Sequence, residues 1–241
     1  MKNRISFLII LFMTNISSIP VFANPGDILN IQLGGINSSA YTNGAAINDN
    51  IQIWNRLRST SLTTVNNLMY YNSGSTDKTG ISVTYHSNMG STSTMFPSSS
   101  LDVKLMKGFA KTTDTVGFFN FSGLTNGTYN IYVYSQAAPN KLQTSHLTVT
   151  SNFESKDFTL TNTGNDKLFI ENTNWMMKTI VVTDGTLNFS LGTDSYLNGI
   201  QIQQITDAVP EPANIVLIGV GGILLFGFQK RDRNEKDIVK R

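Results

Sequence analysis

The chain contains no cysteine and only two histidines among its 241 residues. Without cysteine it cannot form a disulfide scaffold, a thiolate zinc site, an iron–sulfur cluster or a thiol nucleophile. The two histidines, His86 and His146, are too few for a histidine-rich metal site, and no G-x-S-x-G turn lies near either of them. We therefore expect no cofactor, no metal site, no catalytic residues and no enzymatic activity.

Charged residues are also scarce, at 14% of the chain, and they are unevenly distributed. The net charge of +2 comes from the ends, because Lys2 and Arg4 lie near the start and residues 230–241 hold six basic and three acidic side chains. Residues 24–229 keep ten basic and thirteen acidic side chains, a net charge of −3. A mildly acidic body without a basic stripe is a poor nucleic-acid binder, so we expect no nucleic-acid partner.

The first 23 residues have the pattern of a secretory signal peptide. A short apolar core at residues 5–13 follows the two basic residues, and Val21 and Ala23 precede a predicted cleavage site between Ala23 and Asn24. The alternative is a retained membrane anchor, which needs about 20 apolar residues and therefore a longer core. We expect signal peptidase to cleave residues 1–23 during export.

A second apolar run, residues 213–228, lies near the C-terminus and carries no charge. As a helix it would be about 24 Å long, slightly less than the ~30 Å hydrocarbon core of a bilayer. The basic side chains of Lys230, Arg231 and Arg233 follow it directly, whereas a buried core helix, the alternative, has no need of such a cluster. By the positive-inside rule, we expect one transmembrane helix with residues 234–241 as a short charged cytoplasmic tail.

The tripeptide Pro210-Glu211-Pro212 lies immediately before this run. Its prolines fix φ and lack N–H donors, so the segment cannot join a helix or a sheet. The motif, the apolar helix and the basic cluster, in this order, resemble the PEP-CTERM sorting signal of bacterial exosortase systems. The resemblance implies that a membrane-embedded exosortase recognises residues 208–233 and cuts near the motif, which leads to a cell-surface or extracellular location.

Residues 24–207, between these two signals, have the pattern of an all-β domain. Short runs of alternating apolar and polar residues are separated by turn residues such as Asn126-Gly127 and Asp184-Gly185. We expect a β-sandwich, with an ambiguous short helix within 51–69 and a long loop at 91–100. The expected strands are residues 29–33, 81–85, 101–105, 119–121, 129–134, 168–170, 179–183, 187–191 and 200–202.

Two segments of this domain carry a second resemblance. Residues 123–134 (GLTNGTYNIYVY) and 196–202 (YLNGIQI) are similar to a hairpin and a final strand found in PEP-CTERM ectodomains with a galactose-binding-like jelly roll. The resemblance implies a jelly-roll-like β-sandwich. Within 129–134 we expect Tyr129, Ile131 and Val133 to face the core, and the intervening side chains to face the other way.

The resemblance implies a structural or adhesive role linked to exopolysaccharide and biofilm. A lectin-like carbohydrate-binding module is the first alternative, with Trp54 and Trp175 as candidate sugar-stacking residues, although large aromatic residues more often fill a core. A surface carbohydrate-active enzyme is the second alternative; it needs paired carboxylates, and the domain contains only two glutamates, Glu154 and Glu171. The oxygen-rich turns at 48–50 and 192–194 lack the ligand density of a calcium loop.

Overall fold

The computed structural model describes residues 26–34, 41–42, 45–47, 53–71, 79–91, 94–98, 100–112 and 117–205. The predicted signal peptide, the cleavage site before Asn24, the 208–233 sorting signal and the 234–241 tail lie outside these residues, so they stay predictions. No helix among the described residues is long and apolar enough to cross a membrane.

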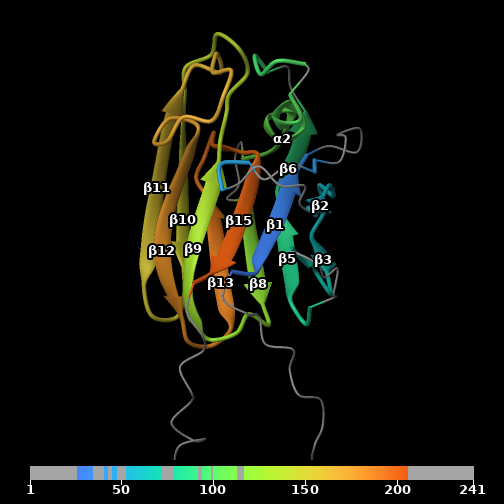
Figure 1. The fold of residues 1–241 in the computed structure, drawn as a ribbon, viewed down its shortest axis with the longest axis vertical. Helices are drawn as coiled ribbons and strands as arrows, with labels where there is room; N and C mark the ends of the chain where they lie inside the picture. The colour runs from blue at the N-terminus through green and yellow to red at the C-terminus, as the bar shows by residue number, and fades with distance from the viewer. Residues whose placement is uncertain are drawn as a thin grey trace, which may run out of the picture. The chain divides into compact units, whose positions relative to one another are not determined.

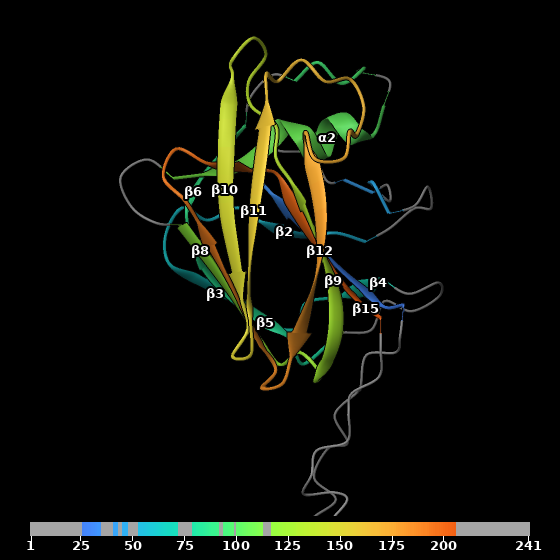
Figure 2. The same cartoon turned by 90° about the vertical axis from the view of Figure 1, so that its left-hand side faces the viewer.

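The fold is mostly β, with its two larger sheets packed in a sandwich-like arrangement (Figures 1 and 2). One six-stranded sheet, here the first sheet, has the order β12-β9-β15-β1-β2, and β4 also pairs with β1. The second sheet has the order β11-β10-β13-β8-β5-β3. Bounds in the first sheet are β1 Ile28–Leu33, β2 Asn55–Leu57, β4 Tyr70–Tyr71, β9 Gly127–Tyr134, β12 Trp175–Val182 and β15 Gly199–Gln204. Bounds in the second are β3 Thr63–Val65, β5 Ser82–His86, β8 Gly117–Ser122, β10 Gln143–Thr150, β11 Ser155–Asn162 and β13 Thr186–Leu191.

The two ends of the sandwich differ. A small three-stranded sheet, β14-β7-β6, and the short helix α2 (Asp102–Lys107) accompany the larger sheets, and α2 lies at the upper end in Figure 1. The strands of the small sheet are β6 Asn88–Ser91, β7 Gly108–Lys111 and β14 Tyr196–Leu197. Gly26 and Ile205 both lie at the opposite end, because β1 and β15 are antiparallel neighbours with Ile28 opposite Gln203.

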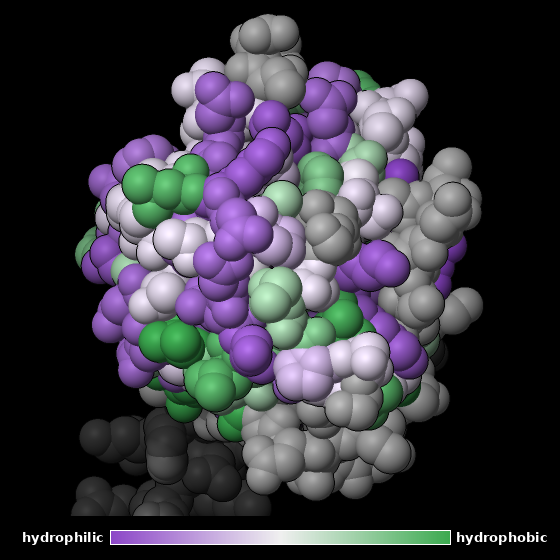
Figure 3. All heavy atoms as spheres, turned by 90° about the horizontal axis from the view of Figure 1, so that it is seen from above, coloured by the Kyte–Doolittle hydropathy of each residue, from purple (hydrophilic) through white to green (hydrophobic). Residues whose placement is uncertain are grey.

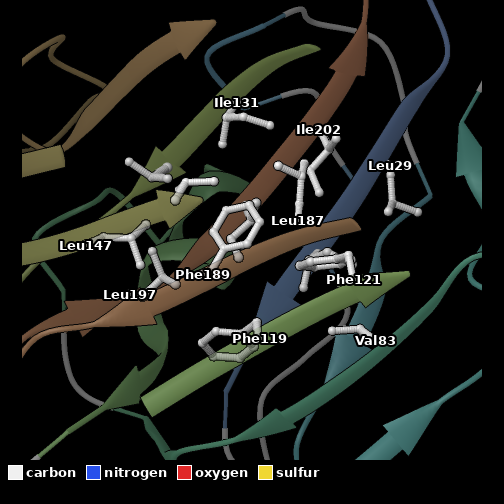
Figure 4. Close-up of a cluster of buried hydrophobic side chains, with 14 of the residues drawn as sticks. Leu29, Val83, Phe119, Phe121, Ile131, Leu147, Leu187, Phe189, Leu197 and Ile202 are labelled. Atoms are coloured by element: carbon white, nitrogen blue, oxygen red, sulfur yellow. The ribbon is translucent and has the colours of Figure 1, made fainter. Parts of the chain in front are cut away.

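The main hydrophobic core lies between the two large sheets, where side chains from both point toward one another (Figure 4). Strands β8 and β9 alternate in burial along their length, as a strand with one face on a core must. Tyr129, Ile131 and Val133 are at most 1% exposed, which confirms the predicted register of this segment.

A second, smaller core covers the outer face of the first sheet near α2. It consists of six buried side chains from this sheet, α2 and the neighbouring loops: Tyr41, Trp54, Phe96, Leu105, Met106 and Tyr134. All six residues of β1 are buried. On its outer face Gln32 is covered on the α2 side, where its side chain accepts from Tyr41 N and donates to the Lys104 carbonyl.

Three local predictions were wrong. Of residues 101–105, the last four form part of α2 and Leu101 directly precedes it, because the spacing of Leu101 and Leu105 also fits one turn of helix. Ser100 Oγ accepts the Asp102 N–H at 3.1 Å at the start of the helix. Residues 168–170 form no strand, because the Asn174 side chain bonds Ile170 N at 2.8 Å and Leu168 O at 2.9 Å and folds the segment into a turn. The described residues 53–69 contain β2 and β3 and no helix.

The predictions omitted eight short or polar strands. Strands β10 and β11 contain only two apolar residues each among their eight, which is too few for a clear alternation. Their core-facing side chains include Leu147, Val149, Phe158 and Leu160, which are all buried. The other six omitted strands have two to four residues each, too few to establish an alternation; they are β2, β3, β4, β6, β7 and β14.

Replacing Ile131 with aspartate tests the register of β9. Ile131 is fully buried between the sheets, so an unpaired charge there should cost several kcal/mol, a large share of a domain's ~5–15 kcal/mol stability. We expect Ile131→Asp to unfold the domain in urea titrations followed by circular dichroism. The control Asn130→Asp, on the half-buried opposite face, should shift the midpoint only slightly; equal destabilisation by both variants would contradict the register.

Candidate binding face

The outer face of the first sheet carries a group of half-buried or exposed aromatic and polar side chains. Strand pairing aligns them, because Thr179 of β12 and Gln203 of β15 lie opposite Asn130 of β9 on either side. Directly paired residues point to the same face of a sheet. We define the binding face as these side chains together with two aromatic ones: Asn130, Tyr132, Trp175, Thr179 and Gln203.

Two aromatic rings form the apolar part of the binding face. Tyr132 and Trp175 are stacked, with ring centroids 6.3 Å apart and an interplanar angle of 26°. Met177, which is 38% exposed, lies opposite Tyr132 on β12 and extends this apolar surface. Both rings are partly accessible, so the pair offers a flat apolar surface beside polar groups, as ligand-orienting sites commonly do.

The polar part of the binding face consists of two amides whose oxygens are already engaged. Tyr132 Oη donates to Gln203 Oε1 at 3.2 Å, and Thr179 Oγ1 donates to Asn130 Oδ1 at 2.9 Å. These bonds hold the amide planes in place and do not use the amide N–H donors. The face therefore combines an apolar ring pair with amide groups suited to hydroxyl-rich ligands.

A buried hydrogen-bond chain supports the same face from the α2 side. Tyr134 Oη donates to Gln201 Oε1, and Gln201 Nε2 donates to Asn30 Oδ1 at 2.7 Å. Asn30 Nδ2 then donates to the carbonyl of Ile53 at 3.0 Å, and Ala46 N donates to Tyr134 Oη at 3.2 Å. Burial raises the pKa of Tyr134 well above its ordinary value, so its hydroxyl stays neutral and keeps its donor.

A second tyrosine, Tyr41, is bonded both to β1 and to α2. Tyr41 N donates to Gln32 Oε1 at 2.9 Å, and Tyr41 Oη donates to Asp102 Oδ1 at 2.6 Å. The ring of Trp54 packs edge-on against Tyr41 at 4.9 Å. Burial, followed by the bond to Asp102, raises the pKa of Tyr41, so this hydroxyl also stays a donor.

The two tryptophans that the sequence indicated as candidate sugar contacts differ in their exposure. Trp54 is 6% exposed within the smaller core, which leaves little ring area for a ligand. Trp175 is half-buried on the binding face beside Tyr132. Sugar contact stays a prediction for both residues, and the geometry favours Trp175.

The other candidate residues lie elsewhere. His86 and His146 are on β5 and β10 of the second sheet, and His146 is exposed with Nδ1 3.3 Å from Thr159 Oγ1. Glu154 pairs with Lys156, whose hydrogen bond lowers the pKa of that carboxyl, and Glu171 is exposed. Within the described ranges no group of three or more histidine, cysteine, aspartate or glutamate residues could hold a metal. The sorting residues Pro210, Glu211, Pro212, Lys230, Arg231 and Arg233 lie outside those ranges.

The sequence prediction missed the partners of Trp175. The alternation of apolar and polar residues in 129–134 already predicted that Asn130 and Tyr132 face away from the core. In the last strand Gln203 occupies a polar position of the same kind of alternation. The missing information was the pairing, because β9 lies between β12 and β15 in a register that no local pattern indicates.

The surface at the end of the sandwich near α2 differs from the binding face in how polar and apolar side chains are distributed. Viewed from this end, the surface is largely hydrophilic with separate hydrophobic groups (Figure 3). Exposed apolar side chains lie in three loops at this end. They are Leu101 beside α2, Leu142 between β9 and β10, and Leu168 and Ile170 between β11 and β12.

Comparison with known proteins gives no family. No protein-family model and no curated protein matches the sequence. Among solved structures, the chain is similar to a Bacteroides uniformis beta-glucuronidase 2, determined covalently bound to cyclophellitol-6-carboxylate aziridine, with 13% identity and a TM-score of 0.41. The similarity covers 74% of this chain and 18% of that enzyme's chain.

Replacing Tyr134 with phenylalanine tests the buried chain. The loss of its hydroxyl removes the partner of Gln201 Oε1 and of Ala46 N, which should destabilise the domain by about 1–3 kcal/mol in urea unfolding. Tyr132→Phe is the matched control, because Tyr132 is half-exposed and water can replace its hydroxyl as a partner of Gln203. An equal loss of stability in both variants would contradict the supporting role of Tyr134.

Proposed function

We propose that this chain is an exported bacterial surface protein that an exosortase sorts, with a structural or adhesive role in an exopolysaccharide or biofilm matrix. The observation that carries the proposal is the order of three parts in the sequence: the Pro210-Glu211-Pro212 motif, an apolar run and a basic cluster. The signal-peptide pattern of residues 1–23 supports export independently of them. The mostly β body, which contains no cysteine, suits a stable extracellular domain that does not depend on redox conditions.

The strand order supports a jelly-roll-like ectodomain. Along the chain, β1, β9, β12 and β15 belong to the first sheet, and β8, β10, β11 and β13 belong to the second. Within the sheets the spatial orders are β12-β9-β15-β1 and β11-β10-β13-β8. The first strand of the domain, β1, is therefore the neighbour of the last strand, β15. A jelly roll likewise interleaves eight strands, four in each of two sheets, which is why we favour this arrangement for the ectodomain.

The triple alanine variant of Pro210, Glu211 and Pro212 tests the sorting proposal. Alanine restores two backbone N–H groups and allows the following helix to extend outward, which removes the extended segment that a peptidase needs. We expect a full-length protein retained in the membrane, measured by its size and its fraction in membrane versus outer-surface material. The host without its exosortase should give the same result with the natural sequence.

A proline in the body provides the control for this experiment. Pro139→Ala changes a half-buried loop residue between β9 and β10, so it should leave processing unchanged. Normal processing of the triple alanine variant would refute the sorting proposal and leave a plain single-pass anchor.

A carbohydrate-binding role is a second candidate, and the stacked pair of Tyr132 and Trp175 favours it. Flat aromatic rings bind the apolar face of a pyranose, and nearby amides can donate hydrogen bonds to hydroxyl groups. The binding face offers both within one sheet, with Asn130 and Gln203 beside the rings. Binding of this kind would make the protein an adhesive component of a polysaccharide matrix.

Removing the ring of Trp175 tests this candidate. On a glycan array, and with the host's exopolysaccharide, we expect Trp175→Ala to lose about five- to thirty-fold in affinity, the loss of one stacking contact of roughly 1–2 kcal/mol. Phe153→Ala is the control, because Phe153 is 71% exposed in the β10–β11 turn. Absence of glycan binding by the natural protein, or an equal loss in the control, would leave the purely structural role.

A further inference from the structure

The three strands of the binding face, β12, β9 and β15, lie side by side (Figure 1) and contain a single charged residue, Lys178. Alternation along β12 places Lys178 on the same side as Ile180, which is buried in the main core. Its Nζ donates to the Asp157 carbonyl of β11 and lies 5.6 Å from the centroid of the Phe158 ring. This charge is therefore held against the second sheet, and the binding face itself carries none.

The side chains that define the binding face also stay neutral over the physiological pH range. Tyr132 is the one titratable group among them, and burial raises the pKa of its hydroxyl, although a hydrogen bond with Asn130 acts in the opposite direction. The amides of Asn130 and Gln203 and the hydroxyl of Thr179 do not titrate. The face therefore offers hydrogen-bonding groups and rings without a charge of either sign.

The charged groups at the two ends of β12 do not favour an anionic ligand. Glu171 is exposed in the β11–β12 loop, and its backbone forms a bridge with Trp175 at the start of the strand. Near the other end, Glu154 Oε1 accepts the Val181 N–H at 2.7 Å, and this carboxylate is paired with Lys156. An acidic ligand along β12 would therefore meet a carboxylate at each end of the strand.

Two other cations do not compensate for this. Arg56 lies on β2, so β1 separates it from β15 and from the binding face. Lys167 is exposed in the β11–β12 loop, where Asp166 precedes it and Glu171 follows, so the loop has a net negative charge. Neither cation gives the face a positive charge.

This charge distribution separates two classes of polysaccharide. Carboxylate, sulfate and phosphate groups are bound by arginine or lysine side chains, and an anion that loses water without such a partner is strongly disfavoured. Uncharged sugars need only hydroxyl and amide partners beside a flat ring. The binding face provides the second set of groups and lacks the first.

The same groups extend over a length greater than one sugar ring. Trp175 and Thr179 are four residues apart on β12, which corresponds to about 13 Å along the strand. Thr179, Asn130 and Gln203 lie opposite one another on three adjacent strands, which corresponds to about 10 Å across the sheet. A ligand that contacts both the rings and the amides must therefore contain several linked sugars.

We propose that the binding face takes an uncharged polysaccharide, contacts it over more than one sugar unit and discriminates against acidic polysaccharides. This inference rests on the carbohydrate-binding role proposed for the face and names the class of its ligand. The net charge of −3 of residues 24–229 acts in the same direction, because it repels an anionic polymer at long range.

Binding of the full-length protein in detergent to matched neutral and acidic glycans tests the proposal. The probes are array glycans that differ by a hexuronate in place of a hexose, and the host's exopolysaccharide before and after chemical reduction of its carboxyl groups. We expect the neutral member of each bound pair to bind at least about ten-fold more tightly. A trisaccharide should bind more tightly than its monosaccharide, and raising NaCl from about 50 to about 500 mM should change the affinity less than about two-fold.

Met177→Lys tests whether the missing charge sets this preference. Met177 is 38% exposed and lies opposite Tyr132, so a lysine there adds a cation to the binding face. We expect it to tighten binding of the hexuronate glycans by about two- to five-fold at low salt, and the gain to disappear at high salt. The matched control is Asn188→Lys, which adds the same charge at an exposed position of β13 in the second sheet and should leave both affinities unchanged.

Three outcomes would overturn the proposal. The first is binding of hexuronate glycans as tight as that of their neutral counterparts, or tighter; if Trp175→Ala still weakens it, the carbohydrate-binding role stands and only the ligand class fails. The second is a Met177→Lys variant that gains no more than Asn188→Lys, because the discrimination would then not arise at the binding face. The third is a natural protein that binds no glycan, which would refute the carbohydrate-binding role together with its ligand class.

Discussion

Strand β9 is buried on both of its faces near α2, and this constraint determines most of the molecule's features. Its inner side chains, Tyr129, Ile131 and Val133, fill the core between the sheets. Its outer side chains include Tyr134, which is fully buried in the smaller core with Tyr41, and Tyr132, which remains half-exposed. Because one strand supplies the main core, the smaller core and the binding face, a shift of one residue in its register would disrupt all three.

The sandwich has no disulfide, and polar side chains close its edge between β11 and β12. Lys178 Nζ of β12 donates to the Asp157 carbonyl of β11, and Glu154 Oε1 accepts the outward Val181 N–H at 2.7 Å. Charged groups at an edge strand prevent it from pairing with another chain. Hydrogen bonding from Lys156 lowers the pKa of Glu154, so this contribution is present above the carboxyl's ordinary pKa and is lost as pH falls through the lowered value.

Local pattern predicted the parts of the fold in which every second residue is apolar over five or more positions. Residues 129–134 and 187–191 are such segments, and both are strands as expected. The pattern failed where five residues fit two periods, as in α2, and where a side chain decides the backbone, as Asn174 does for the turn at 168–170. For the binding face, the sequence identified Trp175 as a candidate, but only strand pairing brings Tyr132 and Gln203 beside it.

The position of the last strand bears on how the domain would carry load from a C-terminal anchor. Strand β15 ends at Gln204, and it pairs with β1 on one side and β9 on the other. Its last residues are held further, because Ile205 N donates to the Thr128 carbonyl at 2.9 Å and Thr125 Oγ1 donates to Gln204 Oε1 at 2.8 Å. A force applied to the chain beyond Ile205 acts along β15. To extract this strand it must break the hydrogen bonds to β1 and to β9 together, whereas an edge strand could be removed one hydrogen bond at a time. This arrangement suits a domain that would be attached to a membrane or a surface carrier through the segment that follows Ile205.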